Sequence, residues 1–269
     1  MKKPYMLVLI LTCLSFSFQS CEDRSKPKEI QEAKKSDAAT KKVIPTDEIV
    51  NEFYDAIFDK DNQKVSQMLG TSFPADYLPK NKISPLQALI WSSDDADLAK
   101  QLIEGGANFN SKDNPAVLIA CEYKRLETLK YLIAKGSDIK QTEAFNKAGF
   151  YQFYEGAKVL LLKGANQEKG DIRGKIWVYE QAVTKSDYEV LKALKLTKEE
   201  INQHSCDGET ALIIAVKQNN PKMVEYLIKR GANKNKPETF DCGDDIHYGK
   251  TPIQIAKEHN FREIAALIE

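Results

Sequence analysis

Short apolar blocks recur along the chain from about Asp47 onward, and four of them are followed within three residues by the same polar signal. The signal is glycine, a small residue and then Asn or Asp. Its four copies are Gly106-Ala107-Asn108, Gly136-Ser137-Asp138, Gly164-Ala165-Asn166 and Gly231-Ala232-Asn233. Glycine readily adopts the left-handed backbone conformation that ends a helix. Each apolar block is therefore predicted to be a helix that stops at its glycine.

A second signal lies about 20 residues before these glycines and predicts where a preceding helix begins. It places Ser, Thr or Asn before Pro or Ala and an apolar residue. The copies are Ser84-Pro85-Leu86, Asn114-Pro115-Ala116, Thr210-Ala211-Leu212 and Thr251-Pro252-Ile253. Ser, Thr and Asn are good N-cap residues, and Pro is tolerated at the first helical position. Each unit is thus predicted to contain two helices that form a hairpin.

Spacing and residue types together resemble the ankyrin repeat, whose units are about 33 residues long and begin T-P-L-H-x-A. The best copy runs from Asp207 to Asn233 and contains Asp207-Gly208-Glu209-Thr210-Ala211-Leu212. Gly249-Lys250-Thr251-Pro252-Ile253 begins a copy that is nearly as good. The usual His is replaced by Gln87, Ile213 and Gln254, and we expect this to weaken the helix-capping network.

The resemblance implies an all-α ankyrin-repeat solenoid of about seven stacked helix-turn-helix units, with short hairpin or finger loops, over residues 47–269. The expected units are 48–79, 80–110, 111–140, 141–170, 171–203, 204–236 and 237–269. The first, fifth and seventh lack the glycine signal, and the first and fifth are the degenerate units. One helix pair cannot bury its apolar face alone, so neighbouring units should share a continuous core. Another all-α solenoid of helical hairpins is the structural alternative.

Composition and charge argue against several classes of function. Lys and Arg number 39, as do Asp and Glu, so the formal net charge is zero. A strongly basic nucleic-acid-binding surface is therefore not expected. No phosphate-binding loop, nucleophile elbow or H-E-x-x-H motif occurs. We expect neither catalysis nor a cofactor, and we interpret the acidic pairs Asp94-Asp95 and Asp244-Asp245 as solvated turn residues.

The N-terminal residues are interpreted as a targeting segment. Lys2 and Lys3 precede a mostly apolar stretch from Met6 to Phe18, which is too short to span a bilayer comfortably. Phe18-Gln19-Ser20-Cys21 resembles a bacterial lipobox, although Leu is usual where Phe18 stands. Residues 1–20 are thus predicted to be a lipoprotein signal peptide, with an ordinary secretory signal as the alternative. The implied location is the bacterial cell envelope, either periplasmic or associated with the outer membrane.

Lipidation is predicted at Cys21, and residues 21–46 are predicted to form a flexible, charged linker. Residues 22–45 contain no aromatic side chain and almost no apolar periodicity. Such a segment cannot bury enough surface to offset its conformational entropy. The lipid is the expected membrane contact of the protein.

One Cys and His cluster has several possible chemistries. Cys206 precedes the sixth unit and Cys242 precedes the seventh, so the two thiols could meet across neighbouring finger loops. A disulfide is the favoured interpretation, since an oxidising compartment permits one. Two free thiols, a zinc site with His204 and His247, and a Cys–His nucleophile remain alternatives. Cys121 is predicted to be a small buried side chain.

Ankyrin proteins usually bind partners on their concave face, which is formed by finger loops and the ends of first helices. This register points to four aromatic residues and six polar or aromatic residues of units six and seven. They are Trp91, Tyr123, Phe150, Tyr151, Glu209, Lys217, Gln218, Asp245, Tyr248 and Glu258. Exposed aromatic residues are enriched at binding hot spots. Alternatively, the rings fill gaps between irregular units and the polar residues are simply solvated.

The sequence therefore favours a non-enzymatic protein–protein interaction module, a monomer that binds another protein and no nucleic acid. A periplasmic immunity protein that neutralises a toxin is a sharper version of this function. An envelope scaffold or protector and a Cys/His zinc protein are the alternatives from other classes.

Overall fold

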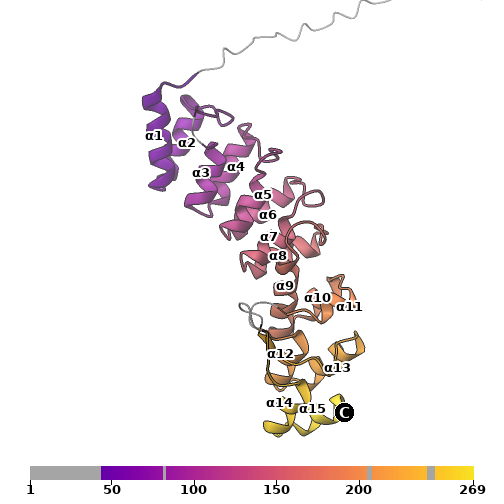
Figure 1. The fold of residues 1–269 in the computed structure, drawn as a ribbon. Helices are drawn as coiled ribbons and strands as arrows, with labels where there is room; N and C mark the ends of the chain where they lie inside the picture. The colour runs from indigo at the N-terminus through magenta and orange to yellow at the C-terminus, as the bar shows by residue number, and fades with distance from the viewer. Residues whose placement is uncertain (1–43, 81–82, 205–207, 241–245) are drawn as a thin grey trace, which may run out of the picture. The chain divides into compact units, whose positions relative to one another are not determined.

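The computed structural model describes residues 44–80, 83–204, 208–240 and 246–269. Within these ranges the chain forms fifteen helices and two short strands (Figure 1). The first nine helices are α1 (Asp47–Phe58), α2 (Asn62–Thr71), α3 (Pro85–Ser92), α4 (Ala96–Glu104), α5 (Ala116–Glu122), α6 (Leu126–Ala134), α7 (Ala144–Phe150), α8 (Tyr154–Leu162) and α9 (Ile172–Thr184). They are followed by α10 (Tyr188–Ala193), α11 (Lys198–Ile201), α12 (Ala211–Lys217), α13 (Pro221–Lys229), β1 (Thr239–Phe240), β2 (His247–Tyr248), α14 (Pro252–Glu258) and α15 (Arg262–Ile268).

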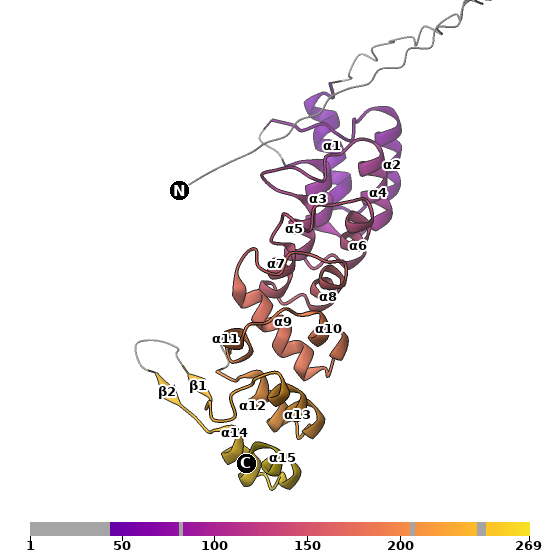
Figure 2. The same cartoon turned by 90° about the vertical axis from the view of Figure 1, so that its right-hand side faces the viewer.

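The helices form seven consecutive pairs, with α11 as an additional short helix after the fifth pair (Figures 1 and 2). We call α1, α3, α5, α7, α9, α12 and α14 the first helices, and their partners the second helices. Each first helix packs against the next first helix along the chain. Second helices α2, α4, α6, α8 and α10 do the same. The predicted all-α array of about seven stacked helix hairpins is confirmed.

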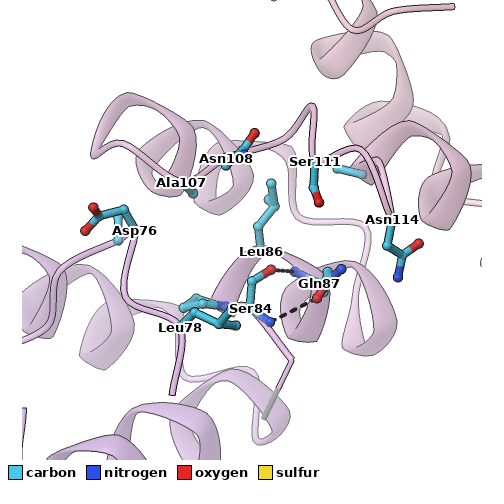
Figure 3. Close-up of a pocket in the computed structure, with 12 residues that line it drawn as sticks. Asp76, Leu78, Ser84, Leu86, Gln87, Ala107, Asn108, Ser111 and Asn114 are labelled. Carbon is cyan, nitrogen blue, oxygen red and sulfur yellow. Dashed lines mark hydrogen bonds between the residues drawn. The ribbon is translucent and has the colours of Figure 1, made fainter. Parts of the chain in front are cut away.

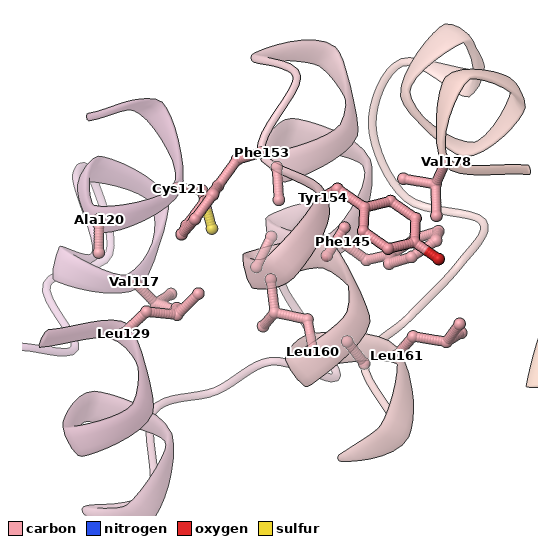
Figure 4. Close-up of a cluster of buried hydrophobic side chains, with 14 of the residues drawn as sticks. Val117, Ala120, Cys121, Leu129, Phe145, Phe153, Tyr154, Leu160, Leu161 and Val178 are labelled. Atoms are coloured by element: carbon pink, nitrogen blue, oxygen red, sulfur yellow. The ribbon is translucent and has the colours of Figure 1, made fainter. Parts of the chain in front are cut away.

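A continuous apolar core runs through the array, as expected for units that cannot bury their surface alone. Figure 4 shows one part of it, where Val117 and Ala120 of α5 lie near Leu129 of α6 and Phe153 before α8. Cys121 belongs to this core and is completely buried, which confirms the sequence prediction for this residue. Burial raises the pKa of its thiol, so the thiol remains protonated and unreactive.

The helix-start signals are correct at three of their four positions. Ser84, Thr210 and Thr251 are the N-caps of α3, α12 and α14, and each side chain accepts a hydrogen bond from the third helical N–H. The expected weakening by the missing His is wrong at two sites. Gln87 and Gln254 each accept a hydrogen bond from the N-cap backbone N–H and so complete a capping box.

Asn114 is the exception. Pro115, rather than Asn114, occupies the N-cap position of α5, which has no side-chain cap. The α5 helix therefore begins at Ala116, one residue later than predicted. Instead, the N–H of Ala116 donates to the carbonyl of Phe109 at 3.0 Å, so the preceding loop supplies part of the missing cap.

First helices and second helices end with different residue types. The four signal glycines end second helices and have positive φ, as predicted. Six of the seven first helices, all but α3, are followed by a side-chain-bearing residue in the same left-handed region. These residues are Lys60, Lys124, Gln152, Ser186, Asn219 and Asn260. The six positions are occupied by Lys, Gln, Ser and Asn, and no single residue type marks all of them. For this reason the sequence did not predict these helix ends.

Asp94 and Asp95 lie in the turn between α3 and α4, as predicted, with Asp94 exposed, and both carboxylates in addition cap helices. Asp95 accepts from Leu98 N at 2.8 Å and caps α4. Asp94 reaches the next unit, where it accepts from Glu127 N at 3.0 Å and Thr128 N at 2.9 Å at the start of α6. Capping typically stabilises by about 1 kcal/mol.

The fifth unit departs most from the repeat pattern. Its first helix, α9, has 13 residues, whereas α5, α7, α12 and α14 each have seven. Gly149 of α7 and Gly174 of α9 meet so closely that a Cβ on either would overlap the other helix's backbone. Lys175, fully buried, donates to Glu200 of α11 at 3.0 Å and Glu168 at 2.9 Å. The α7–α9 contact and the Lys175–Glu168 pair thus join the fourth and fifth units.

The seventh unit is preceded by a two-stranded antiparallel ribbon, which Figure 2 shows beside α12. Thr239 of β1 pairs with Tyr248 of β2, and Phe240 pairs with His247. The N–H of Thr239 also donates to the carbonyl of Gly208 at 2.9 Å. The ribbon is therefore joined to the loop that precedes α12.

Candidate protein-binding surface

Each first helix of the central units buries most of its side chains and leaves a narrow stripe accessible. The accessible positions are three or four residues apart, which places them on one side of each helix. We call this set the first-helix surface. It comprises Gln87 and Trp91 of α3, Leu118 and Glu122 of α5 with Tyr123 at its end, Lys147 and Phe150 of α7 with Tyr151, Trp177 and Gln181 of α9, and Ile214 and Lys217 of α12.

Trp91 and Tyr123 meet on this surface. Their ring centroids are 5.9 Å apart with an interplanar angle of 30°. The rings remain 41% and 38% exposed, so their mutual contact leaves a substantial aromatic area accessible. Arg125 binds the end of α3 beside this pair, because its guanidinium donates to the carbonyls of Ile90 at 2.7 Å and Trp91 at 2.6 Å. The end of α3 is thereby held by the following unit.

Phe150 and Tyr151 form a second aromatic pair, with centroids 5.5 Å apart in an edge-to-face arrangement. Arg173 lies 5.2 Å from the Phe150 ring centroid, and the Lys147 ammonium lies 5.5 Å from that of Tyr151. Both cations also have acidic partners: Lys147 pairs with Glu122 at 3.3 Å and Arg173 with Asp171 at 2.5 Å. Arg173 holds the pKa of Asp171 below its usual range. This part of the surface combines aromatic area with balanced charge.

Two aromatic residues of the same kind were not predicted from the sequence. Phe58 is half exposed at the end of α1. Trp177 is partly exposed and lies on the accessible side of α9. Phe58 lies in a unit without the glycine signal, and Trp177 lies in the longer α9 helix. Their register could not be projected from the neighbouring repeats.

Three of the polar residues predicted in units six and seven, Glu209, Lys217 and Glu258, form ion pairs. The Lys217 ammonium lies 2.5 Å from carboxylate oxygens of both Glu209 and Glu238, and Lys250 pairs with Glu258. Burial alone would raise the pKa of Glu238, but Lys217 and the Lys250 N–H outweigh it and hold the pKa below its usual range. Burial lowers the pKa of Lys217, but its two carboxylate partners raise it overall. This network joins α12 to the ribbon.

Of two further predicted residues, Gln218 forms a hydrogen bond to another helix and Tyr248 is exposed. Gln218 donates to the carbonyl of Thr184 at 3.2 Å and so links α12 to α9. Tyr248 on β2 is 70% exposed. It is the most accessible of the predicted aromatic residues.

Several predictions fall outside the described residues, namely those for Cys21, Cys206, Cys242 and Asp245. Of the other two members of the Cys and His cluster, His204 forms an isolated backbone bridge with Thr210, and His247 is exposed on β2. Within the described ranges no three His, Cys, Asp or Glu side chains are grouped as metal ligands would be. In the same ranges no helix has the length and apolar character needed to cross a bilayer.

Comparison with known proteins identifies the repeat. A family model described as ankyrin repeats in three copies matches residues 179–268. An ankyrin repeat protein of fowlpox virus (strain NVSL) is 30% identical over 155 residues, which are 54% of this chain and 81% of the viral protein. The chain belongs to the ankyrin repeat family. YahD, an ankyrin repeat protein of Escherichia coli K12, is 26% identical over 211 residues, which cover 73% of this chain and 96% of YahD.

A solved structure shares the ankyrin fold. The human ASB11 ankyrin repeat domain superposes with a TM-score of 0.53 at 15% identity, over 81% of this chain and 97% of that domain. Another relative is an L-asparaginase of Dirofilaria immitis, 25% identical over 217 residues. The match covers 76% of this chain but only 35% of the asparaginase. This chain therefore spans about a third of the length of that relative.

Ankyrin repeats are protein–protein interaction modules and are typically not enzymes. A protein partner is therefore the expected ligand of this array. The first-helix surface is the part of the ankyrin array where exposed aromatic side chains gather over neighbouring units.

Proposed function

We propose that this protein is an envelope-tethered ankyrin-repeat lipoprotein that binds a partner protein through its first-helix surface. The observation that carries the proposal is the exposed Trp91–Tyr123 pair, together with the Phe150–Tyr151 pair two units away from Trp91. Aromatic side chains bury a large area at low entropic cost, and they dominate many interface hot spots.

The surroundings of these rings favour a folded protein as partner over a small molecule. The two pairs extend over three consecutive first helices, α3, α5 and α7. The cavity beside Phe150 and Tyr151 measures only about 190 Å³, and it is lined by charges of both signs at Glu143, Lys147 and Asp171. A broad surface with aromatic anchors and a mixed charged rim is typical of protein interfaces.

Affinity capture tests the binding surface. Full-length protein should capture a specific partner from cell envelopes, identified by mass spectrometry. A Trp91→Ala/Tyr123→Ala/Tyr151→Ala variant should lose that partner while keeping its helical circular dichroism. Leu162→Ala is the matched control, because Leu162 is exposed to a similar degree at the end of second helix α8. Unchanged capture by the triple variant would refute the proposed surface.

The identity of the captured protein distinguishes the specific roles. A toxin as partner would indicate immunity, whereas a resident envelope protein would indicate a scaffold or protector. Anchoring is tested separately with Cys21→Ser, which should abolish palmitate labelling and release the protein from membranes. Retention of the label in Cys21→Ser would disprove lipidation at this residue.

A further inference from the structure

A cavity of about 210 Å³ opens between the loops that precede α3 and α5 (Figure 3). Its apolar lining includes Leu78, Pro85, Leu86, Ala107 and Ala116. A closed apolar cavity of about 150 Å³ can hold a benzene ring. This opening therefore has room for one medium-sized apolar side chain and part of the main chain attached to it.

Polar side chains with unused hydrogen-bonding capacity lie at the cavity. Within the described part of the chain, neither the Asn114 amide nor the Ser111 hydroxyl has a hydrogen-bond partner. Asn114 is available because Pro115 takes the N-cap position that the sequence assigned to Asn114. The Oε1 atom of Gln87 accepts from Ser84 N at 3.0 Å, which leaves the amide N–H groups of Gln87 as donors. Figure 3 shows Gln87, Ser111 and Asn114 on the same side of Leu86.

These three polar groups are neutral and include both donors and acceptors. They match the N–H and C=O groups of a peptide main chain. Pro85, Leu86 and the two alanines favour an apolar side chain, because burying a charge against these residues is costly. Asp76 at the rim further disfavours an acidic side chain.

Helix α3 contributes both to the lining of the cavity, through Gln87, and to the aromatic pair, through Trp91. Gln87 and Trp91 are four residues apart on α3, so they lie on the same side of the helix, about 6 Å apart along its axis. An extended chain advances about 3.3 Å per residue. Two residues of an extended segment therefore bridge the distance from the cavity to the aromatic pair.

We infer that the cavity binds one aliphatic side chain of an extended, uncharged segment of the partner protein, whose main chain bonds Gln87, Ser111 and Asn114. This inference rests on the proposed function, since it assigns the class of segment that the partner presents next to Trp91. Leu, Ile or Met is the expected residue in the cavity. The loop residues Ser111 and Asn114 would then act as specificity determinants, and the aromatic pair would supply adjacent apolar contact.

A peptide selection tests this inference without the natural partner. Linear heptapeptides displayed on phage are selected on the full-length protein and counter-selected on Ser111→Trp, whose indole would fill the cavity. Thr142→Trp is the matched control, because Thr142 is a partly exposed residue of the next finger loop. We expect peptides with one aliphatic residue among uncharged neighbours. Calorimetry with the synthetic, capped peptides should show binding at least tenfold weaker to Ser111→Trp and unchanged binding to Thr142→Trp.

Two single-site variants test the hydrogen bonds. Asn114→Ala and Gln87→Glu should each weaken peptide binding about three- to tenfold, as expected for loss of one hydrogen bond. Gln87→Glu keeps the oxygen that completes the capping box, so α3 should remain folded. Peptides that bind Ser111→Trp as tightly as the wild type, or that require a charged residue, would overturn the inference. A different result would refute only the proposed function. In that case the peptides would depend on the cavity, but the Trp91→Ala/Tyr123→Ala/Tyr151→Ala variant would still capture the partner.

Discussion

The carboxylate of Asp94 accepts a hydrogen bond from the backbone N–H of Thr128 at 2.9 Å, although the two residues belong to neighbouring helix pairs. Helix α6 has Arg125 at its N-cap and no side-chain cap of its own. Arg125 in turn donates to carbonyls at the end of α3. Units two and three therefore exchange helix caps across their interface.

Loss of the Asp94 cap should destabilise the array. Asp94→Ala is expected to lower the free energy of unfolding by about 1–2 kcal/mol, since two N–H groups of α6 lose their acceptor. Urea denaturation followed by circular dichroism measures the change. Asp97→Ala is the control, because this exposed neighbour caps no helix; an equal effect of both variants would argue against a specific cap.

The contact between α7 and α9 should tolerate no added methyl group. Gly174→Ala is expected to cost about 3 kcal/mol or more, because the new Cβ would overlap the carbonyl oxygen of Asn146. Gly70→Ala in α2 is the contrasting variant, since nothing lies within 4 Å of its Cβ position. It should stabilise the protein by about 0.5–1 kcal/mol. Thermal unfolding of the two variants compares them directly, and similar melting temperatures would contradict the close contact.

The Trp91–Tyr123 contact should have a small but measurable coupling. A double-mutant cycle with Trp91→Ala and Tyr123→Ala is expected to give about 0.5 kcal/mol, at the low end for aromatic pairs because both rings are partly exposed. Denaturant titration of the four proteins gives the coupling. If either single variant lowered the free energy of unfolding by several kcal/mol, the rings would instead be core residues.

Stability should depend on pH through Asp187. This side chain caps α10 and accepts from Lys158 at 2.7 Å and Tyr154 at 3.0 Å. Burial alone would raise its pKa, but these partners outweigh it and hold the pKa below the ordinary value. A lowered folded-state pKa gives stability that is present above the unfolded value of about 3.9 and is lost as pH falls through the folded value.

Asp187→Asn keeps a good capping residue but removes the charge. We expect it to be less stable than the wild type by about 1 kcal/mol at pH 7, with the gap closing below about pH 4. Urea titrations across this range measure the gap. Glu189→Gln, which also removes a partner of Lys158, should change little because Glu189 is well exposed. A gap that is constant with pH would exclude a role for the Asp187 charge.

The disulfide between Cys206 and Cys242 remains a prediction. Its support is the hydrogen bond from Thr239 N to Gly208 O, which brings the residues flanking the two cysteines together. A thiol titration of denatured protein purified from an oxidising compartment should find only Cys121 among the three cysteines beyond Cys21. By the loop-entropy model, reduction should then cost about 3–4 kcal/mol. Three titratable thiols would show that the bond is absent.

The repeat architecture was predictable from sequence where one residue type decides the local backbone. Ser84 and Thr251 cap helices, and the glycines after the second helices turn left-handed, because few other residues do either as well. The aromatic residues at the ends of α3, α5 and α7 followed from this register. The proposal that they bind a partner comes from the family and not from the residues alone.

The features that sequence analysis missed depend on a neighbouring unit. Asp94 gives no local sign that it caps a helix more than 30 residues away. Asn114 has the residue type of a cap, but the loop after Phe109 places Pro115 there instead. The close approach of α9 to α7, where two glycines meet, likewise involves residues of two different units. Periodicity within one repeat carries no information on such contacts.

The six side-chain-bearing residues that end first helices in the left-handed region have a practical consequence. An ordinary residue in this conformation costs about 1 kcal/mol relative to glycine, and somewhat less for Asn. Lys124 and Gln152, both exposed, are therefore sites where glycine should raise heat resistance without disturbing a buried side chain. Ser186 should be kept, because its hydroxyl accepts a hydrogen bond from the Asn220 amide at 3.0 Å. Engineering of a thermostable scaffold from this chain would best begin at these turns.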